Sequence, residues 1–223
     1  MRMGQLQAIY KELVPSLLGY APKGSLLFIS PIGHILRGYY FEGSDFDPMS
    51  FYVWVFMLPL YIPAKHLSFN FGKRLTGGYG GSWSLKEIST EDIVNDLLKA
   101  MKREGSPFLE TVATPEKFAT KALEFSDNPN DPYLREAIAY SFILANKQRE
   151  AGEALDLLSA ILAGTDQQKA WVRDMLRRAN SLLEHLVQEP EETKKSLMQW
   201  EKQTLVNLKL ESFSESFRKA RKR

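Results

Sequence analysis

The sequence predicts an α+β fold, in which a small antiparallel β-meander with an N-terminal helix is followed by an all-helical bundle. Up to residue 85, apolar residues alternate or run in short blocks bounded by glycine and proline, as in strands and turns. From residue 86 onward they recur every three or four positions, which is the helical period. We therefore expect two domains, residues 1–85 with the helix and the sheet, and residues 86–223 as a helical domain packed against them.

Composition narrows the class of protein. The chain has 223 residues, of which 44% are hydrophobic and 12% aromatic, and these values suffice for a packed core. Basic residues number 29 and acidic residues 27, and five of the basic ones lie in the last six positions. Without that tail the formal charge is −3, so the chain as a whole does not indicate a polyanionic partner. The absence of cysteine excludes thiol catalysis and cysteine-ligated zinc, and it fits a reducing compartment.

The first part opens with an amphipathic helix over residues 3–18. Its apolar stripe falls on one helical face and consists of Leu6, Ile9, Tyr10, Leu13 and Leu17. Pro15 lies inside this stripe, so we expect the helix to kink or to end early. Four strands follow, separated by turns rich in glycine, proline and aspartate: residues 25–30, 34–42, 50–58 and 67–71. The third strand is so continuously apolar that we expect it to be covered on both faces.

The second part predicts five or six helices. Thr90 supplies a capping oxygen and is followed by two acidic residues, which predicts a helix start there. Gly105-Ser106-Pro107 predicts the end of that helix. Pro115 at a first turn opens another helix, which runs through Phe125. After a loop at residues 126–132, the remaining helices are expected over residues 133–146, 149–163, 166–187 and 190–218.

Residues 134–162 resemble one helical hairpin of the tetratricopeptide type. Small and large apolar residues occupy the packing positions of its two helices: Ile138, Ala139, Phe142, Ala151, Leu155 and Leu158. Alanine stands at position 139 where glycine is usual, and His185 lies 34 residues after Ala151, so the unit does not recur. The resemblance implies a single helical hairpin within the bundle, a scaffold that often presents binding surfaces.

A glycine-rich, basic stretch covers residues 72–81. A phosphate-binding loop needs its lysine after the last glycine and a helix directly behind it, whereas Lys73 lies at the opposite end. We therefore interpret the stretch as a mobile loop that displays Tyr79 and Trp83 for protein recognition, with Lys73 and Arg74 beside them. The alternative is that Trp83 packs back onto the sheet.

The turn Gly43-Ser44-Asp45-Phe46-Asp47 resembles pieces of the nucleotidyltransferase site, in which a Gly-Ser turn accompanies an Asp-x-Asp pair. The resemblance implies that Asp45 and Asp47 hold Mg²⁺ against a triphosphate. A ferrous or zinc site would bring His34 and His66 together near the same carboxylates. Because the two motifs are fused in this chain, the competing interpretation is an acidic turn that merely reverses the backbone.

The tail carries a cluster of basic residues, namely Arg218, Lys219, Arg221, Lys222 and Arg223. Together with Lys73 and Arg74, this cluster could contact a few phosphates, so a nucleic-acid-binding accessory protein is an alternative function. Basic residues are also favourable at a helix C-terminus, which explains the cluster without any partner.

The remaining expectations concern cofactors, location and function. We expect no catalytic residue and no cofactor. The longest apolar run, residues 51–64, has fourteen residues and two prolines, whereas a membrane-spanning helix needs roughly 20 residues. We therefore expect no membrane segment and a cytoplasmic location. The favoured hypothesis is a non-enzymatic bacterial protein of the immunity, adaptor or accessory type. It would bind another protein through the aromatic glycine-rich loop and a surface between the sheet and the helices. A metal- or nucleotide-dependent enzyme is the second alternative.

Overall fold

The computed structural model describes residues 3–78, 80–86, 88–125 and 127–215. Helices account for 54% of the chain and strands for 17%, which confirms the α+β class. The chain falls into two compact units, each taken here as far as it is described. The sheet unit comprises Met1–Leu58, Leu67–Thr111 and Ser212–Arg223, and the helical unit comprises Pro59–His66 and Val112–Glu211. Residues 86–111 thus group with the strands, and the domain boundary predicted after residue 85 stays a prediction.

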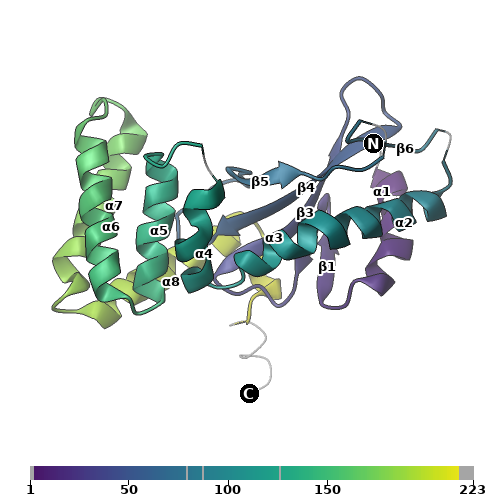
Figure 1. Ribbon diagram of the computed structural model, residues 1–223. Helices are drawn as coiled ribbons and strands as arrows, with labels where there is room; N and C mark the ends of the chain where they lie inside the picture. Colours follow the sequence, from purple (N-terminus) through teal and green to yellow (C-terminus); the bar gives the residue numbers. More distant parts are fainter. Residues whose placement is uncertain (1–2, 79, 87, 126, 216–223) are drawn as a thin grey trace, which may run out of the picture. The chain divides into compact units, whose positions relative to one another are not determined.

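The sheet is an antiparallel meander in which the first five strands lie side by side in sequence order (Figure 1). Its strands are β1 (Tyr20–Lys23), β2 (Leu26–Ile29), β3 (Ile35–Gly43), β4 (Ser50–Pro59), β5 (Phe71–Arg74) and β6 (Trp83–Ser84). The order is β1-β2-β3-β4-β5, and β6 also pairs with β4. Short turns connect β1 to β2, β2 to β3 and β3 to β4, whereas the connection from β4 to β5 contains residues that belong to the helical unit.

The sequence predicts the central strands of this sheet but not its edge strands. The strand β1 is not predicted, because Pro22 in the sequence indicates a break in the chain. However, β1 is an edge strand, where a proline nitrogen needs no partner in the ladder. The fourth predicted strand is wrong in position, since β5 begins at Phe71 and Phe69 lies in the loop before it. The two residues of β6 are too few to leave a strand period in the sequence.

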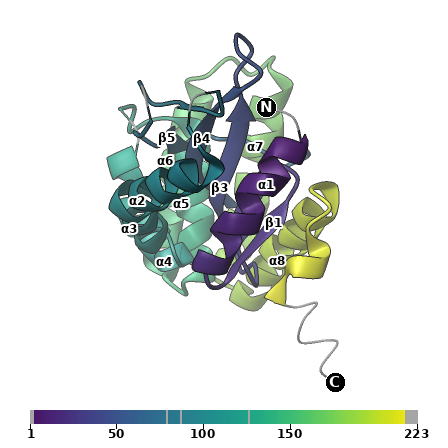
Figure 2. The same ribbon diagram turned by 90° about the vertical axis from the view of Figure 1, so that its right-hand side faces the viewer.

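Helices cover one face of the sheet (Figure 2). α1 (Met3–Leu13) leads into a 3-10 turn at Val14–Ser16, which contains Pro15, so the α-helix ends early, as expected. α2 (Thr90–Ala100) continues through a π-helical segment, Met101–Gly105, into α3 (Ser106–Thr111). The core between these helices and the sheet contains buried apolar side chains from both: Leu6, Ile9, Leu13, Leu27, Phe41, Phe51, Val53, Val55, Ile93, Val94 and Leu97.

The helix that starts near residue 90 corrects two details of the prediction. Its N-cap is Ser89 rather than Thr90, because the Ser89 hydroxyl accepts a hydrogen bond from the Asp92 N–H at 3.1 Å. The helical path also continues past Gly105, where the sequence predicts its end. Gly105 serves close packing instead, since a Cβ atom there would lie 2.4 Å from the Tyr39 hydroxyl oxygen.

The helical unit contains α4 (Pro115–Lys121), α5 (Pro132–Leu144), α6 (Gln148–Ala163), α7 (Ala170–Leu186) and α8 (Pro190–Asn207). α5 and α6 pack against each other as the expected helical hairpin. α8 ends at Asn207 rather than at residue 218, because Lys209 has a left-handed backbone with φ 57°, through which a helix cannot continue. None of the helices in the described part of the chain has the length and apolar character needed to cross a membrane.

Candidate interaction surface

Trp83, the predicted recognition residue, lies in the core of the sheet unit. Its side chain is 2% exposed, and its ring stacks on Phe51 with centroids 6.0 Å apart. The indole N–H donates to Asp96 Oδ2 at 2.8 Å. The structure therefore corrects the expectation of a displayed ring in favour of the alternative, in which Trp83 packs back onto the sheet. Tyr79, the other aromatic residue of the predicted loop, lies outside the described residues.

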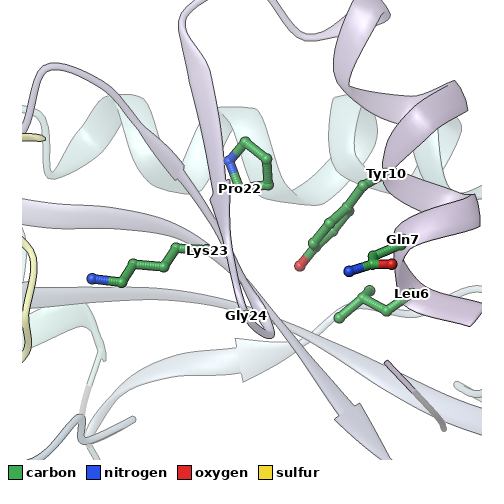
Figure 3. Close-up of a pocket in the computed structure, with 6 residues that line it drawn as sticks. All are labelled: Leu6, Gln7, Tyr10, Pro22, Lys23 and Gly24. Carbon is green, nitrogen blue, oxygen red and sulfur yellow. The ribbon is translucent and has the colours of Figure 1, made fainter. Parts of the chain in front are cut away.

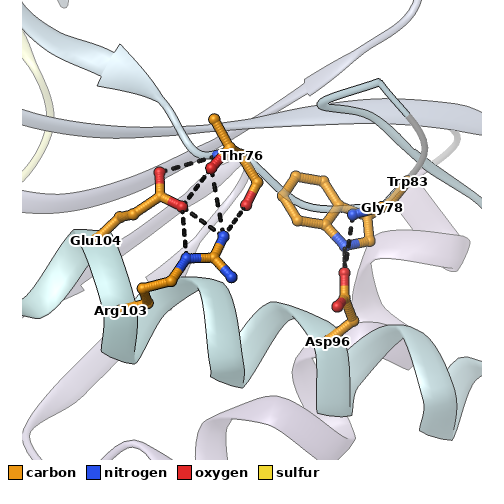
Figure 4. A network of polar contacts seen from close by, with 6 residues as sticks. All are labelled: Thr76, Gly78, Trp83, Asp96, Arg103 and Glu104. Carbon is orange, nitrogen blue, oxygen red and sulfur yellow. Dashed lines mark hydrogen bonds and ion pairs between the residues drawn. The ribbon is translucent and has the colours of Figure 1, made fainter.

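The described part of the glycine-rich loop is fastened to α2 and to the π-helical segment (Figure 4). The Gly78 N–H donates to Asp96 Oδ2 at 2.9 Å, the same oxygen that accepts from Trp83. The Thr76 N–H donates to Glu104 Oε2 at 3.0 Å, while the Arg103 guanidinium donates to the Thr76 carbonyl. The side chains of Asp96, Arg103 and Glu104 thus hold the described part of the loop in place.

The carboxylate of Glu104 is ionised by this arrangement. Partial burial raises its pKa, but hydrogen bonds from Thr76 and the neighbouring Arg103 guanidinium outweigh burial and lower the pKa to about 2. Glu104 is therefore a permanently charged acceptor near neutral pH, which suits a structural fastening more than proton transfer.

The predicted metal residues do not converge. The Asp47 carboxylate accepts from the Met49 N–H at 3.1 Å and from the Ser50 hydroxyl at 2.8 Å, and these bonds lower its pKa. Asp45 is exposed in the same turn. His34 precedes β3 at its other end, and nine residues of strand separate the two sites by about 30 Å. No three His, Cys, Asp or Glu side chains form a metal-binding group among the described residues. Asp47 thus caps the turn that leads from β3 to β4.

A cavity of about 270 Å³ lies between α1 and the β1–β2 turn (Figure 3). It is lined by Leu6, Gln7, Tyr10, Pro22, Lys23 and Gly24. The Tyr10 hydroxyl is buried and has no hydrogen-bond partner among the described residues, and burial raises the pKa of Tyr10. The Lys23 ammonium instead lies 5.8 Å from the Phe213 ring centroid. The Lys23 side chain thus extends away from the Tyr10 hydroxyl (Figure 3).

Among the described residues of the helical unit, Glu136 is a buried carboxylate, and it is 1% exposed. Its Oε1 accepts from the Tyr140 hydroxyl at 3.0 Å and from Arg178 Nη2 at 2.6 Å. Burial raises the pKa of Glu136, although Arg178 and Tyr140 oppose the shift. The contacts join α5 to α7, and a paired, hydrogen-bonded carboxylate of this kind is most simply a structural ion pair.

The strongest candidate for a functional surface lies on the face of the sheet opposite α1 and α2. We call it the aromatic patch, and it consists of Tyr40, Glu42, Tyr52, Trp54, Phe69 and Arg74. Tyr40 and Glu42 alternate along β3 with core residues, and Tyr52 and Trp54 do the same along β4. All four aromatic rings are half-buried. The sequence predicts β4 to be covered on both faces, and this is wrong for its first half, where buried and half-buried residues alternate.

Arg74 is the centre of the aromatic patch. Its guanidinium carbon lies 4.2 Å from the Tyr52 ring centroid and 4.9 Å from that of Trp54. Strand register brings it there, because Arg74 on β5 is directly opposite Trp54 on β4. Each such cation–π contact contributes about 0.5–1 kcal/mol at an exposed site. The register in turn depends on Gly72, where a Cβ atom would lie 2.8 Å from the Val55 carbonyl oxygen.

The Glu42 carboxylate balances the charge of Arg74 in the aromatic patch. Its Oε2 accepts from Arg74 Nη2 and from the Trp54 indole N–H, both at 2.9 Å. The Arg74 side chain stays 47% exposed and that of Glu42 39%, so both charged groups face solvent while their geometry is fixed. Phe69 closes the patch, with its centroid 4.7 Å from that of Tyr40 and 5.9 Å from that of Trp54.

The aromatic patch contains one residue that the sequence analysis selected, Arg74, and five that it missed. Alternation of Tyr52 and Trp54 with Val53 and Val55 is a signal that could have found two of them. Lys73 lies beside Arg74 on β5, is exposed, and makes no ion pair with any described residue. The basic tail, Arg218 to Arg223, lies outside the described residues.

Comparison of the chain with models of known protein families, with curated proteins and with solved structures finds no match.

Proposed function

We propose that this protein is a non-enzymatic interaction protein, of the immunity, adaptor or accessory type, that binds another protein through the aromatic patch. The observation that carries the proposal is the Arg74 guanidinium held over Tyr52 and Trp54 while these rings remain half-buried. Tyrosine, tryptophan and arginine are the residues that most often dominate the binding energy of protein interfaces. Their concentration on one open sheet face supports this surface over others on the chain.

Preorganisation strengthens the proposal. Association costs free energy when side chains lose rotamer freedom, and this cost falls when they are already ordered in the unbound protein. In the aromatic patch, Glu42 holds both Arg74 and Trp54 through hydrogen bonds. A partner would therefore meet a surface whose polar and aromatic groups need little rearrangement.

Charge supports a protein partner over a nucleic acid. The aromatic patch pairs its arginine with a glutamate, so it lacks the excess of positive charge that phosphate backbones require. The chain apart from its last six residues carries a formal charge of −3. The nucleic-acid alternative rests on the tail, and nuclease treatment distinguishes the two.

The experiment is quantitative affinity capture with the full chain as bait. The test variant carries Tyr52→Ala and Trp54→Ala, and the control carries Arg177→Ala and Val187→Ala, which remove an exposed arginine and an exposed apolar side chain on or next to α7. We expect wild type and control to retain one near-stoichiometric protein after nuclease treatment, and the test variant to lose it by roughly tenfold or more. Equal capture by the test variant, with an unchanged melting temperature, would contradict the proposal.

A further inference from the structure

One edge of the sheet carries backbone groups that face away from it. β5 ends the strand order, so β4 is its strand neighbour and its other side adjoins no described strand (Figure 1). The Leu75 N–H donates to the Val53 carbonyl at 2.8 Å, which places residues 71, 73 and 75 in the hydrogen-bonded register with β4. Because the direction alternates along a strand, the N–H and C=O of Gly72 and Arg74 point outward.

At Thr76, the outward backbone groups of this edge already have hydrogen-bond partners. Thr76 would continue the outward series, but its N–H donates to Glu104 and its carbonyl accepts from Arg103 (Figure 4). These two side chains occupy the places that a neighbouring strand would take. The open part of the edge is therefore confined to Gly72 and Arg74, of which Gly72 is partly exposed and Arg74 exposed.

Positive charge lies beside the open edge on the Lys73 face of the sheet. Successive side chains of a strand point to opposite faces, so Lys73 and Arg74 lie on opposite faces of the sheet. Lys73 has no ion pair among the described residues. The Arg74 guanidinium is directed away from the edge, over Tyr52 and Trp54 of β4 and towards Glu42 of β3. An acidic residue on the Lys73 face of an incoming strand would match this arrangement.

We infer that β5 accepts an extended acidic segment of the partner protein as an additional strand. This inference rests on the proposed function. The segment pairs with the outward backbone groups of Gly72 and Arg74, and an acidic side chain of the segment meets Lys73. Strand addition supplies affinity through the main chain, while the flanking side chains select the partner.

A proline substitution separates backbone pairing from side-chain contact. Arg74→Pro removes the outward N–H without removing a bond to β4, because proline is tolerated where an edge N–H faces solvent. Arg74→Ala removes the side chain and keeps the N–H, so it is the matched control. Lys73→Pro removes a residue from the hydrogen-bonded register and should destabilise the sheet, which checks the assignment of inward and outward residues.

The probe is a capped synthetic peptide of about six residues with the central pair Glu-Glu between valines and threonines, a length typical of strands. NMR of the full chain is expected to show amide shifts and slowed exchange at Gly72 and Arg74 on addition of this peptide, and none with its Lys-Lys counterpart. Lys73→Glu should weaken binding roughly tenfold, and added salt should weaken binding to the wild type.

Arg74→Pro should bind the Glu-Glu peptide more weakly than Arg74→Ala, with the folded spectrum retained. Equal binding by these two variants, or no shift at β5 in the wild type, would overturn the inference. Partner capture distinguishes a failure of strand addition from a failure of the proposed function. If partner capture is lost with Tyr52→Ala and Trp54→Ala but equal for Arg74→Pro and Arg74→Ala, the aromatic patch binds the partner without strand addition. If all these variants capture normally, both ideas fail.

Discussion

The two tryptophans of the sheet unit, Trp83 and Trp54, make similar polar contacts in opposite surroundings. Each indole N–H donates to a carboxylate, Trp83 to Asp96 at 2.8 Å and Trp54 to Glu42 at 2.9 Å. Trp83 is opposite Phe51 on the face covered by helices, whereas Trp54 is opposite Arg74 on the other face. The face of the sheet, and not the glycine content of the nearby chain, decides which ring is accessible to a partner.

The glycines beside Trp83 serve packing. A Cβ atom on Gly77 would lie 2.4 Å from the Trp83 ring, and one on Gly78 would lie 2.0 Å from the Ser82 carbonyl oxygen. Gly78 also has a positive φ of 56°, which disfavours any side chain. The glycines therefore allow the backbone to fold closely around the tryptophan.

The largest expected effect is a difference in the free energy of unfolding between the variants Trp83→Ala and Trp54→Ala. Trp83→Ala should lower the free energy of unfolding by about 3–5 kcal/mol, because it leaves a cavity in the core. Trp54→Ala should lower it by about 1 kcal/mol, since the ring is half-buried and its loss leaves no enclosed cavity. Urea unfolding followed by circular dichroism measures both values. Equal losses would break the distinction between a core ring and a binding ring.

Substitution of Gly78 tests whether the loop around Trp83 depends on close backbone packing. Gly78→Ala should destabilise the protein by about 1–3 kcal/mol, because the new methyl group meets the Ser82 carbonyl in a strained backbone conformation. Gly4→Ala is the control, since a Cβ atom there has no neighbour within 4 Å. If Gly78→Ala were as stable as the control, the loop would be more adaptable than its contacts indicate.

The fastening of the loop should also be visible in the pH dependence of stability. The folded pKa of Glu104 is about 2, below its ordinary value of 4.5, so its contribution is present above pH 4.5 and is lost as the pH falls through about 2. Glu104→Gln should remove that part of the acid sensitivity in thermal melts recorded between about pH 2 and pH 6. Identical acid profiles for variant and wild type would show that the fastening contributes nothing.

The smallest expected effect concerns the buried Tyr10 hydroxyl. Unlike the two indole N–H groups, it has no hydrogen-bond partner among the described residues. Tyr10→Phe should leave stability unchanged or raise it by up to about 1 kcal/mol, because the Tyr10 hydroxyl makes no hydrogen bond with the described residues. Tyr61→Phe should have the opposite sign, since the Tyr61 hydroxyl shares a hydrogen bond with Ser141 Oγ at 2.5 Å. Thermal melting of the two variants at one pH compares them directly.

Sequence reasoning succeeded where one period dominates and failed where tertiary contacts decide. The stripe of α1 and the alternation along the central strands are local signals, and they predicted the class and most elements. Gly105 illustrates the limit, because a glycine that ends helices elsewhere here permits contact with Tyr39, a residue remote in sequence. The aromatic patch needed the register of β4 with β5, which places Arg74 opposite Trp54 and which no local pattern contains.

The most direct test of the account compares binding and stability in the same Trp54→Ala variant. The captured amount of the nuclease-resistant partner and the free energy of unfolding are measured side by side with those of the wild type. The account predicts that capture falls by roughly tenfold or more while stability changes by only about 1 kcal/mol. Full capture by a stably folded Trp54→Ala protein would contradict it and remove the aromatic patch as the binding surface.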